Sequence, residues 1–504
     1  MREDSDWARS AVFYQIYPRS FQDANGDGLG DLDGIRARLD HVWDLGADAI
    51  WLSPIYSSPG ADAGYDITDH TAIDPAFGTL ESFDQLVREA HERNLRVLLD
   101  LVPSHTSIEH PWFREHPEWY VWADDGPPNN WLSAFGGPAW SRDPVSGRWY
   151  LHSFYREQPD LNWRHPDVPK AIGEVAQFWR ERGVDGFRVD AVDRLAKDPE
   201  LRDDLPATGP WLLPLPPEYA TLRHVHSRNA EDMGAILDLL RQATGDSVLV
   251  GEVFRPTDEL ESYLDHFDLV FVFEFMFARW HPEDIARVIE PAARLRGCAW
   301  VLSNHDFSRL ASRLGEENLR LAAALLLTLP GAAFVYQGDE IGLRDGPGAH
   351  PPFDRAGRDG ARHPMQWDDT STGGFTSGTP WLHPVDPETR NVAEQARDPD
   401  SLLSLYRRLT RLRKAMSGGL EGVRVDGSAL SYRRGGHLVT LNFGDEDLPL
   451  PSDAEPIFCT ASDANPAQRV PAHGAVVQVV ERSASFVAPD TRVGREDNRD
   501  EEAS

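Results

Sequence analysis

Three carboxylates of this sequence each follow a short apolar run by no more than four residues: Asp190, Glu252 and Asp306. Glycoside hydrolysis needs two carboxyl groups in different environments, one ionised as the nucleophile and the other protonated as the acid. A third carboxylate can bind sugar hydroxyls and support the positive charge of the transition state. If the fold brings the three runs together, these residues predict a site that hydrolyses glycosidic bonds.

The neighbours of two of these carboxylates indicate how their environments differ. Arg188 lies two residues before Asp190, so both side chains point to the same face of a strand. Because a guanidinium lowers the pKa of a nearby carboxyl, we expect Asp190 to be ionised. Glu252 follows the apolar run 248–250 and Gly251, a setting that favours a raised carboxyl pKa. Any one of these carboxylates could instead cap a strand or form a local ion pair, but the three together favour catalysis.

Eight apolar runs supply the strands that must position these side chains: 11–17, 49–52, 96–101, 186–189, 248–250, 269–273, 299–302 and 333–336. Helical patterns with one apolar face fall between them, at 34–45, 80–93 and 171–182. Strands that alternate with helices in this number predict a parallel (β/α)8 TIM barrel, whose strands are buried on both faces. The carboxyl ends of such strands meet at one mouth, where active sites lie.

The alternation is interrupted after the third strand. Residues 103–168 are rich in proline and tryptophan and too long for a barrel loop, so we expect an inserted subdomain. A second irregular segment, 343–390, follows the eighth strand, and a helix at 400–415 closes the barrel. Short strands such as 437–443 and 475–480 predict a C-terminal antiparallel β domain. The predicted units are barrel parts 1–102 and 169–416, insert 103–168, β domain 417–483 and a disordered tail 484–504.

The composition excludes several classes of function. The 504 residues include 82 acidic and 50 basic side chains, a net charge of −32, which argues against binding to nucleic acid or to anionic membranes. Two cysteines exclude a disulfide framework. Met1–Arg9 has no apolar leader core, and no run is as long as a membrane span, so we expect a cytoplasmic protein.

Motifs in order along the chain carry a resemblance to a known family: VFYQIYPRSFQDANGDGLGDLDGI (12–35), GYDITDH (64–70), DLVPSHTS (100–107), QPDLNW (158–163), GFRVDAVD (186–193), VGEVF (250–254), SNHD (303–306), YQGDEIG (336–342) and RDGARHPMQWDD (358–369). The sequence resembles the α-amylase superfamily, glycoside hydrolase family 13. QPDLNW and PMQWDD are similar to the motifs of its α-glucosidases and oligo-1,6-glucosidases.

The resemblance implies a retaining, exo-acting α-glucosidase that works by double displacement. Asp190 would be the nucleophile, Glu252 the acid and base, and Asp306 the group that binds the 2- and 3-hydroxyls. In the family, Tyr and Asp of the GYD motif close the pocket, so Tyr65 would stack on the glucose and Asp66 would accept its 4-hydroxyl. Arg358 would pair with Asp66, and Arg188 would orient Asp190. The aromatic insert would form the roof of the pocket. The residues that the resemblance implies as further substrate contacts are His105, His305, Arg188, Arg358 and Phe135.

A loop near the N-terminus carries hard oxygen ligands that suit Ca²⁺ or Mg²⁺: Asp23, Asn25, Asp27, Asp31 and the Leu29 carbonyl. The resemblance implies a single structural cation there and no organic cofactor. The alternative is a turn rich in Asp, Asn and Gly that holds no metal.

Three positions bear on how far the resemblance extends. Ser104 stands where the family has Asn, which argues against a second metal site, and His363 stands in place of Thr. Ala191, after the nucleophile position, leans towards α-1,4 bonds rather than α-1,6. The expected substrate is a short neutral oligosaccharide, and the chain a monomer or homodimer. Alternatives are an oligo-1,6-glucosidase, or a trehalose- or sucrose-isomerising enzyme. A non-catalytic scaffold is disfavoured, because all three carboxylates are present.

Overall fold

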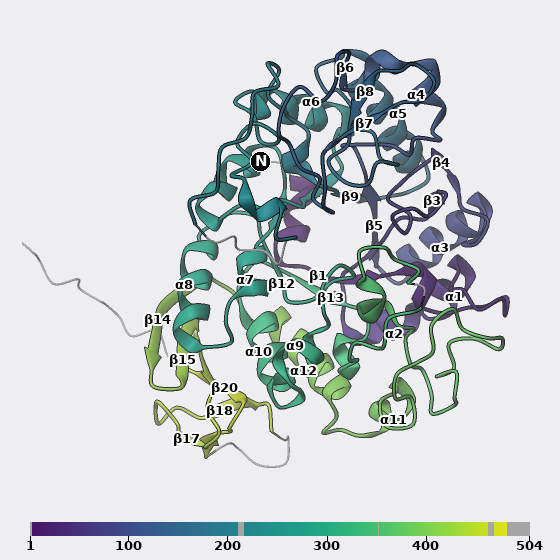
Figure 1. Cartoon of the computed structure of the whole chain (residues 1–504). Coiled ribbons are helices and arrows are strands. Elements are labelled where there is room, and N and C mark those ends of the chain that lie inside the picture. Colours follow the sequence, from purple (N-terminus) through teal and green to yellow (C-terminus); the bar gives the residue numbers. More distant parts are fainter. Residues whose placement is uncertain (1–2, 210–215, 351, 462–467, 481–504) are drawn as a thin grey trace, which may run out of the picture.

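A parallel barrel forms the centre of the computed structural model, which describes residues 3–209, 216–350, 352–461 and 468–480 (Figure 1). All eight predicted strands are confirmed as its members: β1 (Val12–Ile16), β2 (Ala49–Leu52), β5 (Arg96–Leu101), β9 (Gly186–Val189), β10 (Val248–Gly251), β11 (Leu269–Phe271), β12 (Cys298–Val301) and β13 (Ala332–Tyr336). The barrel closes in the order β1-β13-β12-β11-β10-β9-β5-β2. The (β/α)8 fold is therefore confirmed.

The register of three neighbouring strands fixes the positions of the site residues. Asp100 of β5 lies opposite Arg188 of β9, and Val189 of β9 lies opposite Gly251 of β10. Gly186 permits the close approach of β9 to β10, because a Cβ atom there would lie 2.4 Å from the carbonyl oxygen of Val248. The strands thus end level with one another, immediately before the catalytic candidates.

Helices cover the barrel where the periodicity predicts them, with one exception. The patterns at 80–93, 171–182 and 400–415 form α3 (Leu80–Glu92), α5 (Asp167–Glu181) and α12 (Leu402–Ala415). The pattern at 34–45 is divided into α1 (Leu32–Ala37) and α2 (Leu39–Leu45), because Arg38 leaves the helical conformation at φ −113° and ψ 8°. The outer ring also includes α6 (Met233–Thr244), α8 (Pro282–Ala292) and α10 (Leu319–Thr328).

Two excursions rise over the carboxyl ends of the strands. The predicted insert contains a three-stranded sheet of β6 (Trp122–Ala123), β8 (Trp149–Leu151) and β7 (Trp140–Arg142). A second excursion, not predicted, includes the described residues 191–209 and 216–232 between β9 and α6. The two are joined where Trp131 Nε1 donates to the Arg202 carbonyl at 2.8 Å and Asn129 Nδ2 donates to the Leu201 carbonyl at 3.0 Å.

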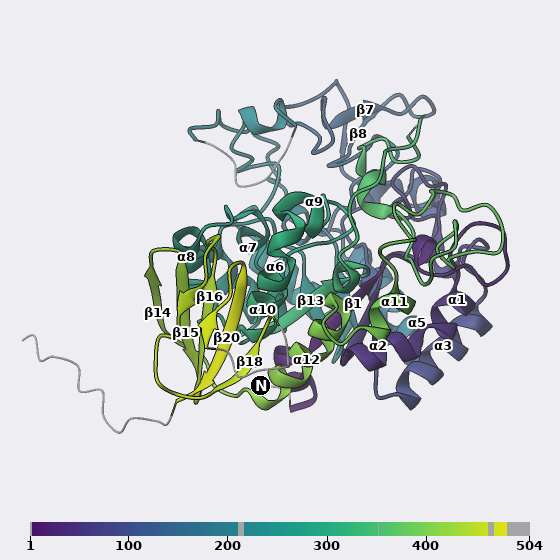
Figure 2. The same cartoon turned by 90° about the horizontal axis from the view of Figure 1, so that it is seen from below.

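The C-terminal region forms the predicted antiparallel sheet. Its strand order is β14 (Leu420–Asp426), β15 (Ala429–Arg434), β16 (His437–Asn442), β20 (Gly474–Val479) and β18 (Pro456–Cys459), beside a small pair of β17 (Leu448–Pro449) and β19 (Arg469–Val470). In both views the sheet and the insert lie on opposite sides of the barrel (Figure 2). The predicted tail, 484–504, lies outside the described residues. No helix in the described part of the chain is long and apolar enough to cross a membrane.

Candidate active site

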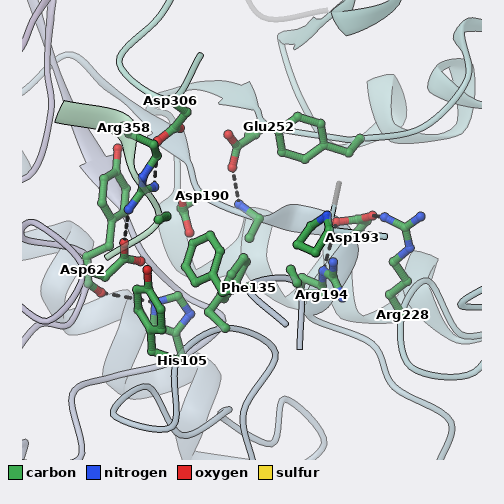
Figure 3. Close-up of a pocket in the computed structure, with 18 of the residues that line it drawn as sticks. Asp62, His105, Phe135, Asp190, Asp193, Arg194, Arg228, Glu252, Asp306 and Arg358 are labelled. Atoms are coloured by element: carbon green, nitrogen blue, oxygen red, sulfur yellow. Dashed lines mark hydrogen bonds and ion pairs between the residues drawn. The ribbon is translucent and has the colours of Figure 1, made fainter. Parts of the chain in front are cut away.

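A cavity of about 570 Å³ opens at the carboxyl ends of the barrel strands. The three carboxylates singled out by the sequence all line it, with Asp190 near the centre of the group (Figure 3). Asp190 and Glu252 are 7% and 4% exposed. The barrel therefore brings residues from three separated strands to one mouth, as their positions after the apolar runs predict.

Arg188 joins the buried carboxylates beneath the cavity. Its guanidinium lies 2.7 Å from Asp190 and 2.6 Å from Asp100, and it also contacts Glu252. Arg188 is 1% exposed, and among the described residues it does not line the cavity. The structure thus confirms the contact with Asp190 and adds two carboxylates that share the same cation.

Burial affects the pKa of Asp190 more strongly than the charge of Arg188 does. Desolvation raises the pKa of Asp190 above its ordinary value despite the nearby guanidinium. Desolvation also raises the pKa of Glu252, which is the higher of the two, and the negative charge of Asp190 adds to this effect. Arg188 lowers the pKa of Asp190, as predicted, but burial outweighs this effect, so the net shift of that pKa is upward rather than downward. Because the two carboxyl groups are buried side by side on one guanidinium, ionisation of one raises the pKa of the other, and the pair favours holding a single proton.

Ala191 connects the two coupled carboxylates through its backbone. Its φ of +45° lies in the left-handed region, which costs an L-residue of this kind about 1 kcal/mol. In this conformation its N–H donates to Glu252 Oε2 at 2.9 Å. The backbone conformation is therefore tied to the orientation of Glu252, and the small side chain of Ala191 leaves room in the cavity that it lines.

Asp306 has the opposite electrostatic environment. Arg358 Nη1 donates to its Oδ1 at 2.9 Å and Arg362 Nη2 to the same oxygen at 3.2 Å. Burial opposes ionisation of Asp306, but neighbouring His305 and the guanidinium groups of Arg358 and Arg362 together outweigh it and hold its pKa well below the usual range. One carboxylate of the cavity is thus firmly ionised, while two compete for a proton.

The acidic group at the Tyr65 end of the cavity is Asp62, not Asp66. Asp66 is fully buried and accepts hydrogen bonds from Ser58 Oγ at 2.9 Å and from the backbone N–H groups of Ala61 and Asp62 at 2.8 and 2.9 Å. These bonds turn its carboxylate into the loop and away from the cavity.

Arg358 pairs with Asp62 at 2.5 Å instead, and both line the cavity beside Tyr65. Figure 3 shows this pair on the same side as His105. The predicted pair of Arg358 with Asp66 is therefore wrong. The correct residue lies three positions before Tyr65 and is itself an aspartate of the same loop.

The two predicted histidines have different positions. His105 lines the cavity, and Ser104 Oγ lies 2.8 Å from its Nδ1, which gives a structural role to that unusual serine. His305 is fully buried, with Gln15 and Tyr65 each 2.8 Å from one of its ring nitrogens, and in this structure it lies outside the cavity lining. The other unusual residue, His363, faces the carbonyl groups of Pro347 and His383.

Phenylalanine and tyrosine side chains of the insert, rather than its tryptophans, reach the cavity. Phe135 lines it together with Phe154 and Tyr155, and the rings of Phe135 and Tyr155 lie 4.4 Å apart. Trp131 and Trp140 are buried within the insert at 1% and 3% exposure. Side chains of the insert therefore line the cavity as expected, while Trp131 and Trp140 pack in a small core of the insert and Trp163 belongs to the main core.

A group of charged residues that the sequence analysis missed lines the side of the cavity away from Asp62 (Figure 3). Arg228 Nη1 donates to Asp193 Oδ2 at 2.9 Å, and Arg194 Nη2 donates to the Tyr219 hydroxyl at 2.5 Å. Asp193 is the last residue of the GFRVDAVD motif, and Arg194 follows it directly. That motif was therefore the sequence signal that could have identified both residues. Nothing in the sequence pattern marks Arg228.

In the loop predicted to bind a cation, the side-chain oxygens of Asp23 and Asp31 accept hydrogen bonds from backbone N–H groups nearby in the sequence. Asp23 accepts from the N–H groups of Gly26 and Gly28 at 2.7 and 2.8 Å, and Asp31 accepts from Ala24 and Gly34 at 3.0 and 2.6 Å. Across the described residues, no three acidic, His or Cys side chains are grouped as metal ligands. The donor types fit a hard cation, but the arrangement gives no independent support for one.

The fold and the cavity define a (β/α)8-barrel protein with three carboxylates at its mouth. Residues 15–419 match the family model described as alpha amylase, catalytic domain, and the chain belongs to this family. It is similar to a probable α-glucosidase of Rhizobium meliloti (strain 1021), 43% identical over 86% of this chain and 88% of the relative.

Two further similarities cover most of the chain. An oligo-1,6-glucosidase of Parageobacillus thermoglucosidasius is 37% identical over 81% of this chain and 84% of the relative. The crystal structure of an α-glucosyl transfer enzyme, XgtA, superimposes with a TM-score of 0.87 and 36% identity, covering 94% of this chain and 99% of that one.

Proposed function

We propose that the protein is a retaining, exo-acting α-glucosidase that cleaves the terminal non-reducing glucose from short α-glucosides. The observation that carries the proposal is the convergence of three carboxylates from three separate barrel strands on one cavity, two of them buried against the same arginine. Two of them, Asp190 and Glu252, have raised pKa values and share Arg188, whereas Asp306 is held ionised. Retaining hydrolysis uses two such neighbouring carboxyl groups, one ionised as the nucleophile and the other protonated as the acid. The close pair of Asp190 and Glu252 on one arginine can hold a single proton between them, and Asp306 supplies the third, ionised group.

In the first step, the Asp190 carboxylate attacks the anomeric carbon while Glu252 gives its proton to the glycosidic oxygen, and the aglycone leaves as an alcohol. In the second step, the Glu252 carboxylate takes a proton from water, the water oxygen attacks the same carbon, and Asp190 is released. Asp306 binds sugar hydroxyls and stabilises the oxocarbenium-like charge.

The ends of the cavity indicate where the substrate lies. The Asp62–Arg358 pair and Tyr65 form a closed, polar end that suits a terminal glucose. The leaving sugar then occupies the other side, near Asp193, Arg194 and Arg228. The small Ala191 side chain supports a preference for α-1,4 bonds.

The test is incubation with maltose, isomaltose, sucrose and trehalose, with analysis of products over time. We expect free glucose from maltose at the highest kcat/KM, with initial release of the α-anomer. Absence of glucose from all four would contradict the proposal. Similarity to a glucosyl transfer enzyme favours transfer as a second activity, which new oligosaccharides at high maltose concentration would reveal.

We also propose a structural Ca²⁺ or Mg²⁺ held by Asp23, Asn25, Asp27, Asp31 and the Leu29 carbonyl. The support is the oxygen-only donor set on one short loop. A cytoplasmic location, in a monomer or homodimer, remains part of the proposal. Among the described residues both cysteines are free, Cys298 buried and Cys459 half-buried, which suits a reducing compartment.

A further inference from the structure

A second cavity, of about 460 Å³, lies at the amino-terminal ends of the barrel strands, opposite the active-site mouth. Segments distant in sequence form it: the start of β1, the residues before β2 and β5, the end of α12 and the end of β15. The C-terminal sheet and the barrel therefore meet at this cavity. A pocket of this volume accommodates a small-molecule ligand.

The charged residues that line the cavity are mostly basic: Arg96, Arg413, Lys414 and Arg434, with Asp48 as the single acidic member. Lys414 Nζ lies 3.0 Å from Asp48, and Arg96 lies 2.9 Å from Asp185. This excess of positive charge contrasts with the net charge of −32 for the whole chain. The cavity is thus a local region of positive potential that attracts anions.

The two buried arginines have carbonyl groups, not carboxylates, as partners. Arg413 Nη1 donates to the carbonyl groups of Leu327 and Leu329 at 3.1 and 2.6 Å, and Arg434 Nη1 donates to those of Thr328 and Leu329, both at 3.1 Å. Among the described residues, neither arginine lies within ion-pair distance of an acidic group, and Arg434 Nε is buried without a hydrogen-bond partner.

The electrostatics agree with this uncompensated charge. Burial, followed by the neighbouring charge of Arg434, lowers the pKa of Arg413 to about 9. All three guanidinium nitrogens of Arg413 donate to backbone carbonyl groups, namely those of Ser10, Leu327, Leu329 and Gly331. Arg434 Nε, by contrast, has no partner within the described part of the chain. These neutral carbonyl groups do not neutralise a full charge. An anion in the cavity would supply the missing counter-charge.

We propose that this cavity binds a small, doubly charged oxyanion, namely inorganic phosphate or the phosphate group of a small phosphorylated alcohol. Arginine and lysine side chains suit phosphate because their N–H groups form charge-assisted hydrogen bonds with its oxygens. The ligand would bridge the barrel and the C-terminal sheet, since Arg434 comes from β15 and Lys414 from α12.

Isothermal titration calorimetry and thermal unfolding of the full chain test this site, with inorganic phosphate and glycerol 3-phosphate as separate ligands and chloride at equal ionic strength as reference. We expect saturable heat and a rise in Tm of about 2 °C near saturation. Tighter binding of glycerol 3-phosphate than of inorganic phosphate would identify the ligand as a phosphorylated molecule. Equal affinity for the two would identify it as the free anion.

Lys414→Gln and Arg434→Gln should each weaken binding at least about tenfold. Lys170→Gln is the matched control, since Lys170 is an exposed lysine of α5 paired with Asp167, and should bind as wild type. If Arg434→Gln fails to fold, Lys414→Gln still decides, because this half-exposed side chain has, within the described part of the chain, the ion pair with Asp48 as its one charged contact. Absence of phosphate-specific heat, or wild-type affinity in Lys414→Gln, would overturn the proposal.

Discussion

Arg188 contacts Asp100, Asp190 and Glu252, so these buried carboxylates compete for one cation. Because one guanidinium cannot neutralise three charges, burial raises the pKa values of all three carboxyl groups. The proton retained by these buried carboxyl groups is the one that Glu252 must give to the glycosidic oxygen in the first step of the proposed reaction. The chemistry of the cavity thus depends on a deficit of positive charge rather than on any single residue.

Asp190→Asn should lower kcat on maltose by a factor on the order of 10⁴, because the amide cannot form the glucosyl ester. Circular dichroism should show an intact fold. Asp167→Asn, which changes an exposed carboxylate of α5, is the control and should retain wild-type kcat. Turnover near the wild-type rate in Asp190→Asn would remove this residue as the nucleophile.

The pH dependence of kcat/KM should be bell-shaped and displaced to higher pH than ordinary carboxyl groups would give. Activity needs Asp190 ionised, so it rises as the pH rises through that pKa; it needs Glu252 protonated, so it falls as the pH rises through the higher pKa of Glu252. Burial raises both values. Glu252→Gln should abolish the alkaline limb for a substrate with a good leaving group. An acid limb near pH 4 in the wild type would contradict the raised pKa of Asp190.

Arg358→Met should lower kcat/KM by about 100-fold or more, because it leaves Asp62 and Asp354 without their shared cation and weakens the hold on Asp306. The loss should be mainly in KM, since Arg362 still contacts Asp306. Kinetics on maltose measure this, with the 76%-exposed Arg156 changed to Met as the control. Equal KM values for Arg358→Met and wild type would exclude a binding role.

The strands of the barrel could be predicted from sequence, and parts of its surroundings could not. A barrel strand is buried on both faces, so it reads as an apolar run whatever surrounds it. The break at Arg38 and the excursion at 191–232 carry no periodicity that would mark them. Tertiary contacts, such as those of Leu201 and Arg202 with the insert, hold this excursion in place.

The site was predictable where a residue directly follows a strand. On the loops the prediction was wrong for Asp66, but it correctly placed three residues at the cavity: Tyr65, His105 and Phe135. Asp190 and Glu252 follow barrel strands, so the register of the strands fixes their positions. Asp62 and Asp66 share one loop, and only its hydrogen bonds decide that Asp66 turns inward. The wrong choice between them reflects this local geometry, which residue type alone does not encode.

Trp131→Ala should loosen the insert without unfolding the barrel. Removal of this buried side chain costs about 3–5 kcal/mol in a core and also deletes its hydrogen bond to Arg202. Because Phe135 lies four residues further on, KM should rise more than kcat falls. Limited proteolysis should cut the insert faster than in wild type. Trp43→Ala, at a 54%-exposed tryptophan, should show neither effect.

At the scale of the whole molecule, removal of divalent cations should lower Tm by several degrees while activity at low temperature stays the same, because the proposed cation stabilises a loop and takes no part in the reaction. Elemental analysis and thermal unfolding with and without chelator measure this. Asp27→Asn should make Tm insensitive to chelator, since Asp27 is exposed and, among the described residues, its side chain accepts a hydrogen bond from the Leu29 N–H alone. A metal-free protein with unchanged Tm would exclude the site.

The pair of Asp62 and Arg358 also determines the order of events in a catalytic cycle. In the proposed reaction, the glucose unit bound beside Asp62 and Arg358 becomes joined to Asp190, so the aglycone departs first and glucose last. Glucose should therefore inhibit competitively with substrate. A longer chain cannot advance by one unit while it stays bound, so each cleavage should be followed by complete dissociation, and digestion should be distributive.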